Sequence, residues 1–332
     1  MDLSIVVAAY NISDFIDDCI LSIVEQDTHI PFELIAVDDG STDDTGERLT
    51  ALAERFPERM RVVTQVNGGL SAARNTGFEH STGEFIWFID GDDMIAPGAI
   101  DSIVATLKQQ ALDCVHFGFQ EVDEAGTELP GRHTPLQLGL ISGRQFFREG
   151  VKAFHIATTA WTYVYRRSLL VQSGLRFEPN LLHEDMLHTP QLLQEADRFV
   201  ALEQAPYLYR QRSGSITQAV NPDKARERVD SLIQIFLDLH YLRRETRDNH
   251  FREALGWYGY HVYRKAVKEA QGADLKECQQ RLRQLNQSTR AWRLFPNHDL
   301  VSGLKKAALS VIYGPTSYFQ RNLRDEARSA RF

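Results

Sequence analysis

The chain has 332 residues, of which 43% are hydrophobic and 25% are charged, a balance typical of a globular protein with a sizeable core. Its 45 acidic residues outnumber its 37 lysines and arginines, so the formal net charge is −8. These figures exclude a disordered chain and a small disulfide scaffold. They also predict no nucleic-acid partner, because proteins that bind nucleic acids usually carry a basic excess.

Neither a signal peptide nor a membrane span is expected. The first residues run directly into an apolar pattern without a basic stretch, and no window approaches the roughly 18 apolar residues of a membrane helix. Three widely spaced cysteines form no Cys-x-x-Cys pair, which suits a reducing compartment. We therefore expect a cytoplasmic protein.

Short apolar runs alternate with helical patterns over the first 125 residues. The runs predict strands at 3–9, 32–37, 61–66, 84–89 and 113–122. Apolar stripes predict helices at 15–24, 49–56 and 100–107, with Asn11 or Ser13 as the cap of the first. This alternation predicts a parallel or mixed sheet with helices on both faces.

The second half of the chain has a different pattern. The polar, Gly- and Pro-containing stretch 126–137 predicts a loop, and a mixed region follows to about residue 217. After Asn221 and Pro222 the sequence is charged and helical. We therefore place a domain boundary near residue 220.

Two groups of carboxylates follow predicted strands. Asp38 and Asp39 end the second strand, where a ligand's base N–H or ribose hydroxyls would meet them, whereas the nearby Asp43 more simply caps the next helix. The sequence DGDD at 90–93 ends the fourth strand. Such mutually repelling carboxylates favour a Mg²⁺ or Mn²⁺ site; the alternative is a solvated acidic turn.

A glycine-rich segment with a fixed cation lies between these groups. Gly69 allows a close approach of backbone to a ligand, and Arg74 supplies the positive charge. A plain turn followed by a surface arginine is the alternative interpretation. No Walker A loop and no GxGxxG after the first strand occur, which argues against a P-loop protein or a dinucleotide dehydrogenase.

Together, the segments SIVVAAYN (4–11), VDDGSTD (37–43), GLSAARNTG (69–77) and DGDD (90–93) resemble family 2 glycosyltransferases in order and spacing. The resemblance covers roughly the first 110 residues. It implies an α/β GT-A fold, with a mixed, mostly parallel central sheet flanked by helices and followed by a helical C-terminal region. It also implies inverting sugar transfer from a nucleotide diphosphate sugar, usually UDP-linked, with Mn²⁺ or Mg²⁺ as cofactor.

Carried onto this sequence, the resemblance gives each segment a role. Residues 1–110 would form the nucleotide-sugar-binding half of a catalytic domain, 111–220 its acceptor-side half, and 221–332 the helical region. Two groups of residues are implied in donor binding. The nucleotide would meet Ala9, Tyr10, Asp38, Asp39, Gly69 and Arg74, and the metal would meet Asp90, Asp92 and Asp93.

The resemblance also implies a general base, Asp185, assisted by the adjacent Glu184, although acids at this point equally suit a helix N-terminus. Trp161 is either a wall of the sugar or acceptor pocket or an ordinary core residue. Arg210 and Arg212 either neutralise a diphosphate or belong to an exposed basic turn. The QxxRW motif of processive synthases is absent from the sequence, which favours addition of a single sugar.

The expected partners are a UDP-sugar donor and a glycan or lipid-linked acceptor in the synthesis of a bacterial surface polysaccharide, lipopolysaccharide or capsule. Basic and apolar residues mix at 300–324, which suits a peripheral contact with the inner face of the cytoplasmic membrane or, alternatively, a docked helix or a homo-oligomer contact. Two other functions stay open. They are a sugar-phosphate nucleotidyltransferase and a catalytically silent scaffold that binds nucleotide sugars.

Overall fold

The computed structural model describes residues 1–212 and 222–289. The chain divides into two compact units. One consists of Met1–Phe147 and Ala157–Ser215, and the other of Arg148–Ile156 and Ile216–Phe332. The boundary expected near residue 220 and the mixed basic and apolar segment at 300–324 lie outside the described residues.

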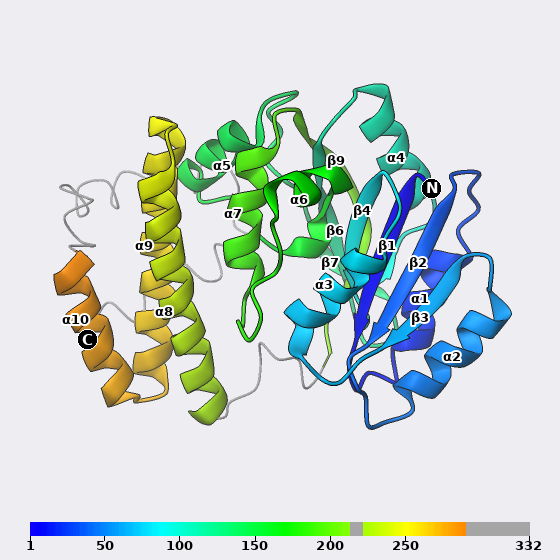
Figure 1. The fold of residues 1–332 in the computed structure, drawn as a ribbon, viewed down its shortest axis with the longest axis horizontal. Coiled ribbons are helices and arrows are strands. Elements are labelled where there is room, and N and C mark those ends of the chain that lie inside the picture. Colours follow the sequence, from blue (N-terminus) through cyan, green and yellow to red (C-terminus); the bar gives the residue numbers. More distant parts are fainter. Residues whose placement is uncertain (213–221, 290–332) are drawn as a thin grey trace. The chain divides into compact units, whose positions relative to one another are not determined.

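The first unit is built on one mixed sheet, whose described strands follow the order β3-β2-β1-β4-β8-β6-β9-β5, with β7 beside β6 (Figure 1). Strands β1 to β4 pair in parallel, as do β6 and β9, while β8 runs antiparallel between β4 and β6. The strands are β1 (Leu3–Ala9), β2 (Phe32–Asp38), β3 (Met60–Thr64), β4 (Phe85–Asp90), β5 (Met94–Ile95), β6 (Cys114–Val122), β7 (Glu128–His133), β8 (Tyr163–Arg166) and β9 (Phe199–Arg210).

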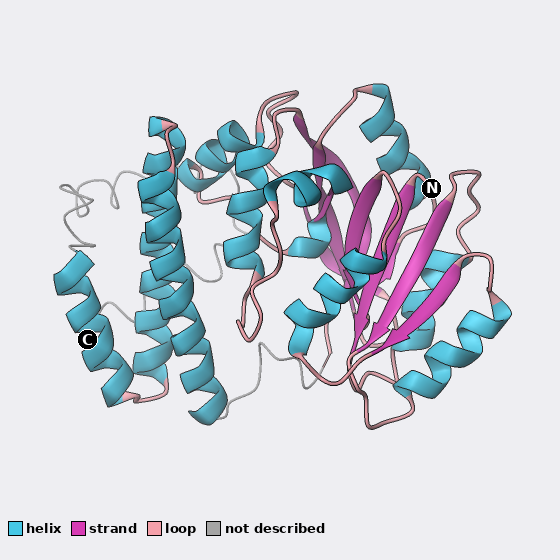
Figure 2. Cartoon of the chain, in the orientation of Figure 1, coloured by secondary structure: helices cyan, strands magenta, loops and turns pink. Residues whose placement is uncertain are grey.

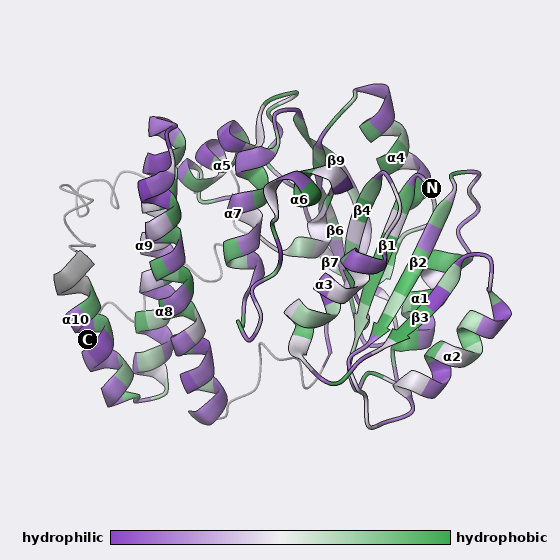
Figure 3. Ribbon diagram, in the orientation of Figure 1, coloured by the Kyte–Doolittle hydropathy of each residue, from purple (hydrophilic) through white to green (hydrophobic). Residues whose placement is uncertain are grey.

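Helices cover both faces of the sheet (Figure 2). Alternate residues of β1 and β4 form one core with α1, α2 and α4, and the strands stand out as apolar in Figure 3. Helix α3 packs on the opposite face so closely that a Cβ on Gly77 would lie 2.1 Å from Cγ1 of Val6. The helices up to residue 195 are α1 (Ile16–Val24), α2 (Thr45–Arg55), α3 (Gly69–His80), α4 (Ala99–Gln109), α5 (Gly143–Lys152), α6 (Arg167–Ser173) and α7 (Asp185–Glu195), with a 3₁₀ turn at Ala160–Thr162.

The predicted elements of the first 125 residues are confirmed as β1, β2, β3, β4 and β6 and as α1, α2 and α4. The loop predicted at 126–137 is wrong, because it contains β7, which pairs with β6. The predicted capping of α1 is also wrong. Helix α1 begins after Phe15 without a side-chain cap, and Asn11 accepts a 2.8 Å hydrogen bond from the Thr42 backbone N–H instead.

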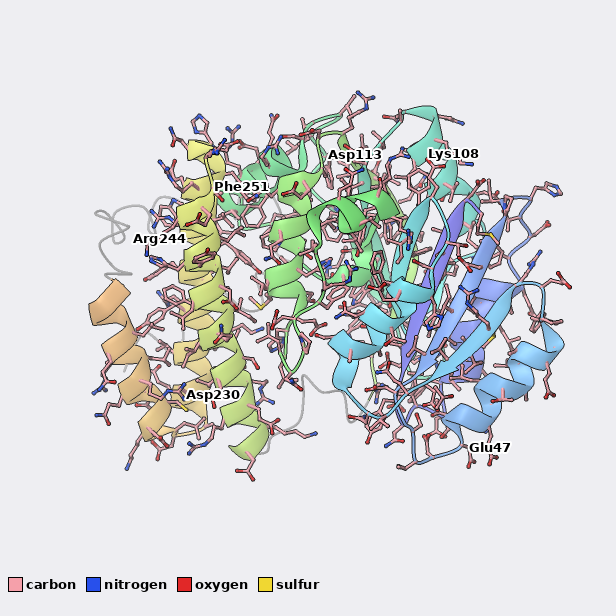
Figure 4. All side chains as sticks on the ribbon, viewed as in Figure 1. Glu47, Lys108, Asp113, Asp230, Arg244 and Phe251 are labelled. Atoms are coloured by element: carbon pink, nitrogen blue, oxygen red, sulfur yellow. The ribbon has the colours of Figure 1, made fainter. Side chains whose placement is uncertain are left out.

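The second unit is helical, as predicted, with α8 (Pro222–Glu245), α9 (Asn249–Gly272) and α10 (Lys276–Thr289). Asp248 caps α9 by accepting the backbone N–H groups of His250 and Phe251. Asp230, labelled in Figure 4, forms a 2.5 Å ion pair with Arg281 that joins α8 to α10. Within the described ranges, no helix combines the length and apolar character needed to cross a bilayer.

Candidate active site

The carboxyl ends of three neighbouring strands bring the predicted donor-side residues to one edge of the sheet. Ala9 at the end of β1 pairs with Asp38 of β2, and Ala8 pairs with Asp90 of β4. These three strands are parallel, so the backbone that follows each of them emerges at the same edge. Tyr10, the next residue after β1, is about half exposed there. This edge is where open α/β sheets bind ligands.

Asp39 holds the glycine-rich segment. Its carboxylate accepts hydrogen bonds from the Gln65 side chain (2.7 Å) and from the backbone N–H groups of Gly68 (2.9 Å) and Gly69 (2.8 Å). Gly69 has a φ of +82°, in the left-handed region that favours glycine. Asp38 accepts the Ser41 backbone N–H at 3.0 Å. The two carboxylates therefore fix the backbone around the expected nucleotide position.

Arg74 links two acidic segments in the interior. Its Nη2 atom lies 2.6 Å from Oδ1 of Asp90, and its Nη1 atom forms an ion pair with Glu184. The Arg74 side chain is only 3% exposed. Burial alone would lower the pKa of this guanidinium, but Asp90 and then Glu184 raise it above its already high value, so Arg74 stays charged.

Glu184 and Asp185 lie at the start of α7, where the helix dipole favours acids. Glu184 is buried, and burial raises the pKa of its carboxyl although the positive charge of Arg74 acts in the opposite direction. Asp185 is partly exposed. The helix thus places a buried acid on Arg74 and a second, more accessible acid beside it.

The acids of the DGDD segment point in different directions. Asp92 lies 2.6 Å from Nε of Arg212. Asp93 is buried and accepts hydrogen bonds from the Tyr207 hydroxyl (2.6 Å) and the Arg210 backbone N–H (2.8 Å). Burial, followed by the negative charges of Asp92 and Asp90, raises the pKa of the Asp93 carboxyl well above its usual value.

Arg210 and Trp161 are both buried. The Arg210 guanidinium is buried against Asp18 (2.9 Å) and the Glu124 carbonyl (2.6 Å). The buried Trp161 ring stacks on Tyr207, with centroids 4.3 Å apart, and also on Tyr209. Arg212 is therefore the arginine of this segment that meets an expected ligand-binding acid, while Trp161 belongs to an aromatic core.

Asp90 and Asp92 carry carboxylate oxygens that suit a divalent cation. Arg74 occupies one oxygen of Asp90 and Arg212 occupies one oxygen of Asp92, so each of these partly exposed carboxylates has a second oxygen to offer. Hard carboxylate oxygens suit Mg²⁺ and Mn²⁺. No cluster of three or more acids, histidines or cysteines arranged for a metal occurs among residues 1–212 and 222–289. The residues thus fit an ion whose coordination is completed by phosphates, not a closed protein cage.

Sequence reasoning missed four residues that support this arrangement: Asn75, Phe177, His188 and Tyr207. Asn75 follows Arg74 directly in the glycine-rich segment, and its short polar side chain was the available signal. Phe177 and His188 stack at 3.9 Å between ring centroids, next to Arg74. Nothing in the local sequence distinguishes these two aromatic residues from ordinary core residues.

Comparison with known proteins identifies relatives that are similar to this chain over about 220 residues. The chain is 34% identical over 221 residues to EpsJ of Bacillus subtilis, described as an uncharacterized glycosyltransferase, a match that covers 65% of this chain and 63% of the relative. It is 30% identical over 220 residues to the uncharacterized glycosyltransferase YibD of Escherichia coli, with the same two coverages. The chain therefore matches somewhat under two thirds of the length of these relatives.

Solved structures share the fold. The S. aureus TarS 1–349 structure in complex with UDP-GlcNAc superposes with a TM-score of 0.65 at 23% identity and covers 81% of this chain and 75% of that chain. The mannosyltransferase PcManGT from Pyrobaculum calidifontis, in complex with GDP-Man and Mn²⁺, gives a TM-score of 0.56 at 18% identity, with coverages of 95% and 88%. The fold is that of GT-A glycosyltransferases, as expected.

The family described as "Glycosyl transferase family 2" has a sequence model that matches residues 4–171. This range contains the strand ends that carry Asp38, Asp39 and Asp90, together with Arg74 of α3. The chain therefore belongs to glycosyltransferase family 2.

Proposed function

We propose that this protein transfers one sugar from a UDP-sugar to a hydroxyl of a glycan or lipid-linked acceptor, with inversion, in the synthesis of a surface polysaccharide, lipopolysaccharide or capsule. The observation that carries the proposal is the single guanidinium of Arg74. It joins Asp90, at the end of β4, to Glu184, at the start of α7. The expected donor acid and the acid next to the expected base therefore belong to one interior network.

The donor side of the proposal rests on the shared edge of β1, β2 and β4. The nucleotide would lie against Tyr10 and the segment fixed by Asp39. The TarS complex with UDP-GlcNAc supports a UDP-sugar as donor, and the PcManGT complex with GDP-Man and Mn²⁺ supports a nucleotide sugar with a divalent ion. Asp90 and Asp92 would hold that ion, which supplies positive charge to the leaving diphosphate.

This chain's own residues would perform the remaining steps. Asp185 would accept the proton of the acceptor hydroxyl as that oxygen forms a bond to the anomeric carbon and the bond to the diphosphate breaks. Arg212, released from Asp92, would be free to turn toward the phosphates. Asp93 would stay inside, where its bonds to Tyr207 and the Arg210 backbone fix the end of the acidic segment.

The test is release of UDP from a panel of UDP-sugars, with and without Mn²⁺, and with GDP-mannose as a donor of the other nucleotide class. We expect Mn²⁺-dependent UDP release from at least one UDP-sugar, and an inverted product when an acceptor is supplied. Release of GDP from GDP-mannose, with no UDP release from any UDP-sugar, would show that the donor is a GDP-sugar and not a UDP-sugar. No release from any nucleotide sugar would contradict the proposal and favour the silent scaffold.

A further inference from the structure

The side chain of Asn75 makes a matched pair of hydrogen bonds with the backbone of Phe177. Its amide Nδ2 donates to the Phe177 carbonyl at 2.8 Å, and its Oδ1 accepts the Phe177 N–H at 2.9 Å. The two residues are 102 positions apart. A single side chain of α3 thus satisfies both the backbone N–H and the backbone carbonyl of Phe177.

The Phe177 ring lies beneath Arg74, the residue that pairs with both Asp90 and Glu184. It is buried and packs edge-on against Phe88 at 5.1 Å and face-to-face on His188 at 3.9 Å. The Arg74 guanidinium lies over the same ring, with its central carbon 5.1 Å from the centroid. A cation above an aromatic face is attracted to it, so the position of the ring influences where the Arg74 guanidinium lies.

The segment that carries Phe177 leads into the start of α7. Residues 174–184 contain no helix or strand. Two of them, Asn180 (φ +57°) and His183 (φ +63°), adopt a backbone conformation that non-glycine residues seldom take. Such conformations persist only where surrounding contacts hold them. The hydrogen bonds between Asn75 and Phe177 hold this segment seven residues before Glu184.

We propose that Asn75 is a positioning residue for sugar transfer, an inference that rests on the proposed function. By fixing the Phe177 backbone, it sets the aromatic surface beneath Arg74, and Arg74 in turn sets Glu184 and the adjacent base Asp185. Asn75 contacts neither donor nor acceptor in this proposal. Its effect reaches the reaction through the orientation of α7.

The experiment compares two variants with a matched control. Asn75→Ala removes the hydrogen bonds, and Phe177→Leu keeps an apolar side chain and the backbone bonds but removes the ring beneath Arg74. Glu79→Gln is the control, because the exposed Glu79–Arg176 ion pair (2.8 Å) joins the same helix to the same segment at the surface. Steady-state kinetics, calorimetric UDP binding and amide hydrogen exchange are measured for each.

We expect both variants to lower kcat by about tenfold to a hundredfold, as a small misplacement of a catalytic group does, with the KM for donor and the UDP affinity unchanged. Exchange should accelerate in 177–190 in Asn75→Ala. The control should match wild type throughout. The inference is overturned if either variant, folded and binding UDP, keeps the wild-type kcat. It is also overturned if kcat and UDP affinity fall while the KM for donor rises, as in a general loss of structure.

The two proposals fail in different ways. A wild-type protein that acts on no nucleotide sugar contradicts the proposed function, whereas an active wild type with an equally active Asn75→Ala variant contradicts only the role of Asn75. If the wild type is inactive, hydrogen exchange still tests the role of Asn75. Unchanged amide exchange at 177–190 in Asn75→Ala would show that Asn75 does not fix the Phe177 backbone.

Discussion

Arg74 and Glu184 are separated by 110 residues in the chain and form an ion pair in the interior, where both side chains are less than a tenth exposed. Asp90 completes the arrangement on the other side of the same guanidinium. One cation therefore balances two acids from separate elements, β4 and α7. Removing it would leave those acids facing each other without compensation.

The first prediction concerns this cation. Arg74→Met should lower the free energy of unfolding by about 3–5 kcal/mol, because breaking a buried pair leaves an uncompensated buried charge. Chemical denaturation measures the change. Arg48→Met is the control, since the Arg48–Asp17 pair is 43% exposed on both sides and its loss should cost about 0–1 kcal/mol. Equal losses in the two variants would show that the interior pair has no special importance.

The second prediction concerns the proposed base. Asp185→Asn should reduce kcat by about 10²- to 10⁴-fold, because the amide cannot accept the acceptor's proton, while UDP binds as it does to wild type. Turnover and calorimetry with UDP measure the two effects. Glu195→Gln, at the other end of α7, should leave both unchanged. Normal turnover by the Asp185→Asn variant would show that another group takes the proton.

The sequence predicted the strand ends well because each is a local pattern. The apolar runs of β1, β2 and β4 stop at polar residues, and parallel pairing then brings those ends together. Strands β8 and β9 were missed for physical reasons. Strand β8 has only four residues, and β9 contains Glu203, Gln204 and Pro206, which interrupt its alternation. Their places depend on pairing with β4 and β6, which no local pattern reveals.

The interior contacts of the site were less accessible to sequence reasoning. The basic run at 210–212 left open whether its arginines meet a diphosphate or form an exposed basic turn, and neither interpretation predicts that Arg210 is buried on Asp18, which lies 192 positions away. Which acid an arginine meets depends on how α1 and β9 pack, and the chain carries more acids than arginines to choose from. The same limit applies to Arg74 and Glu184, whose pairing depends on how α3 lies against the start of α7.

The third prediction concerns the divalent ion. A chelator should abolish UDP release and added Mn²⁺ should restore it, because the ion stabilises the leaving diphosphate. Asp92→Asn should weaken Mn²⁺ binding in the presence of UDP by about tenfold or more, which corresponds to about 1.4 kcal/mol. Electron paramagnetic resonance of free Mn²⁺ measures this. Asp101→Asn, on α4, is the control, and equal Mn²⁺ affinities in the two variants would remove Asp92 from the metal site.

The last prediction concerns a buried histidine. Burial, and secondarily the positive charge of Arg74, lower the pKa of His188 to about 3. Its neighbours are the Phe177 ring, the Tyr165 ring and Arg74, and its Nε2 atom has no hydrogen-bond partner among the described residues. His188 is therefore neutral in the folded protein at neutral pH, whereas the unfolded chain takes up a proton near pH 6.5.

The pH dependence follows from this difference. Above about pH 6.5 the imidazole is neutral in both states and has no effect, but between about pH 6.5 and pH 3 only the unfolded chain binds the proton, so stability falls by up to about 1.4 kcal/mol per pH unit. His188→Phe keeps an aromatic ring for Phe177 and should remove this contribution. Denaturation at pH 7.5, 6.0 and 4.5 should show a shallower decline for His188→Phe than for wild type or for a variant at the exposed His29, His29→Gln. Parallel declines in all three proteins would mean that the pKa of His188 is the same in the folded and unfolded states.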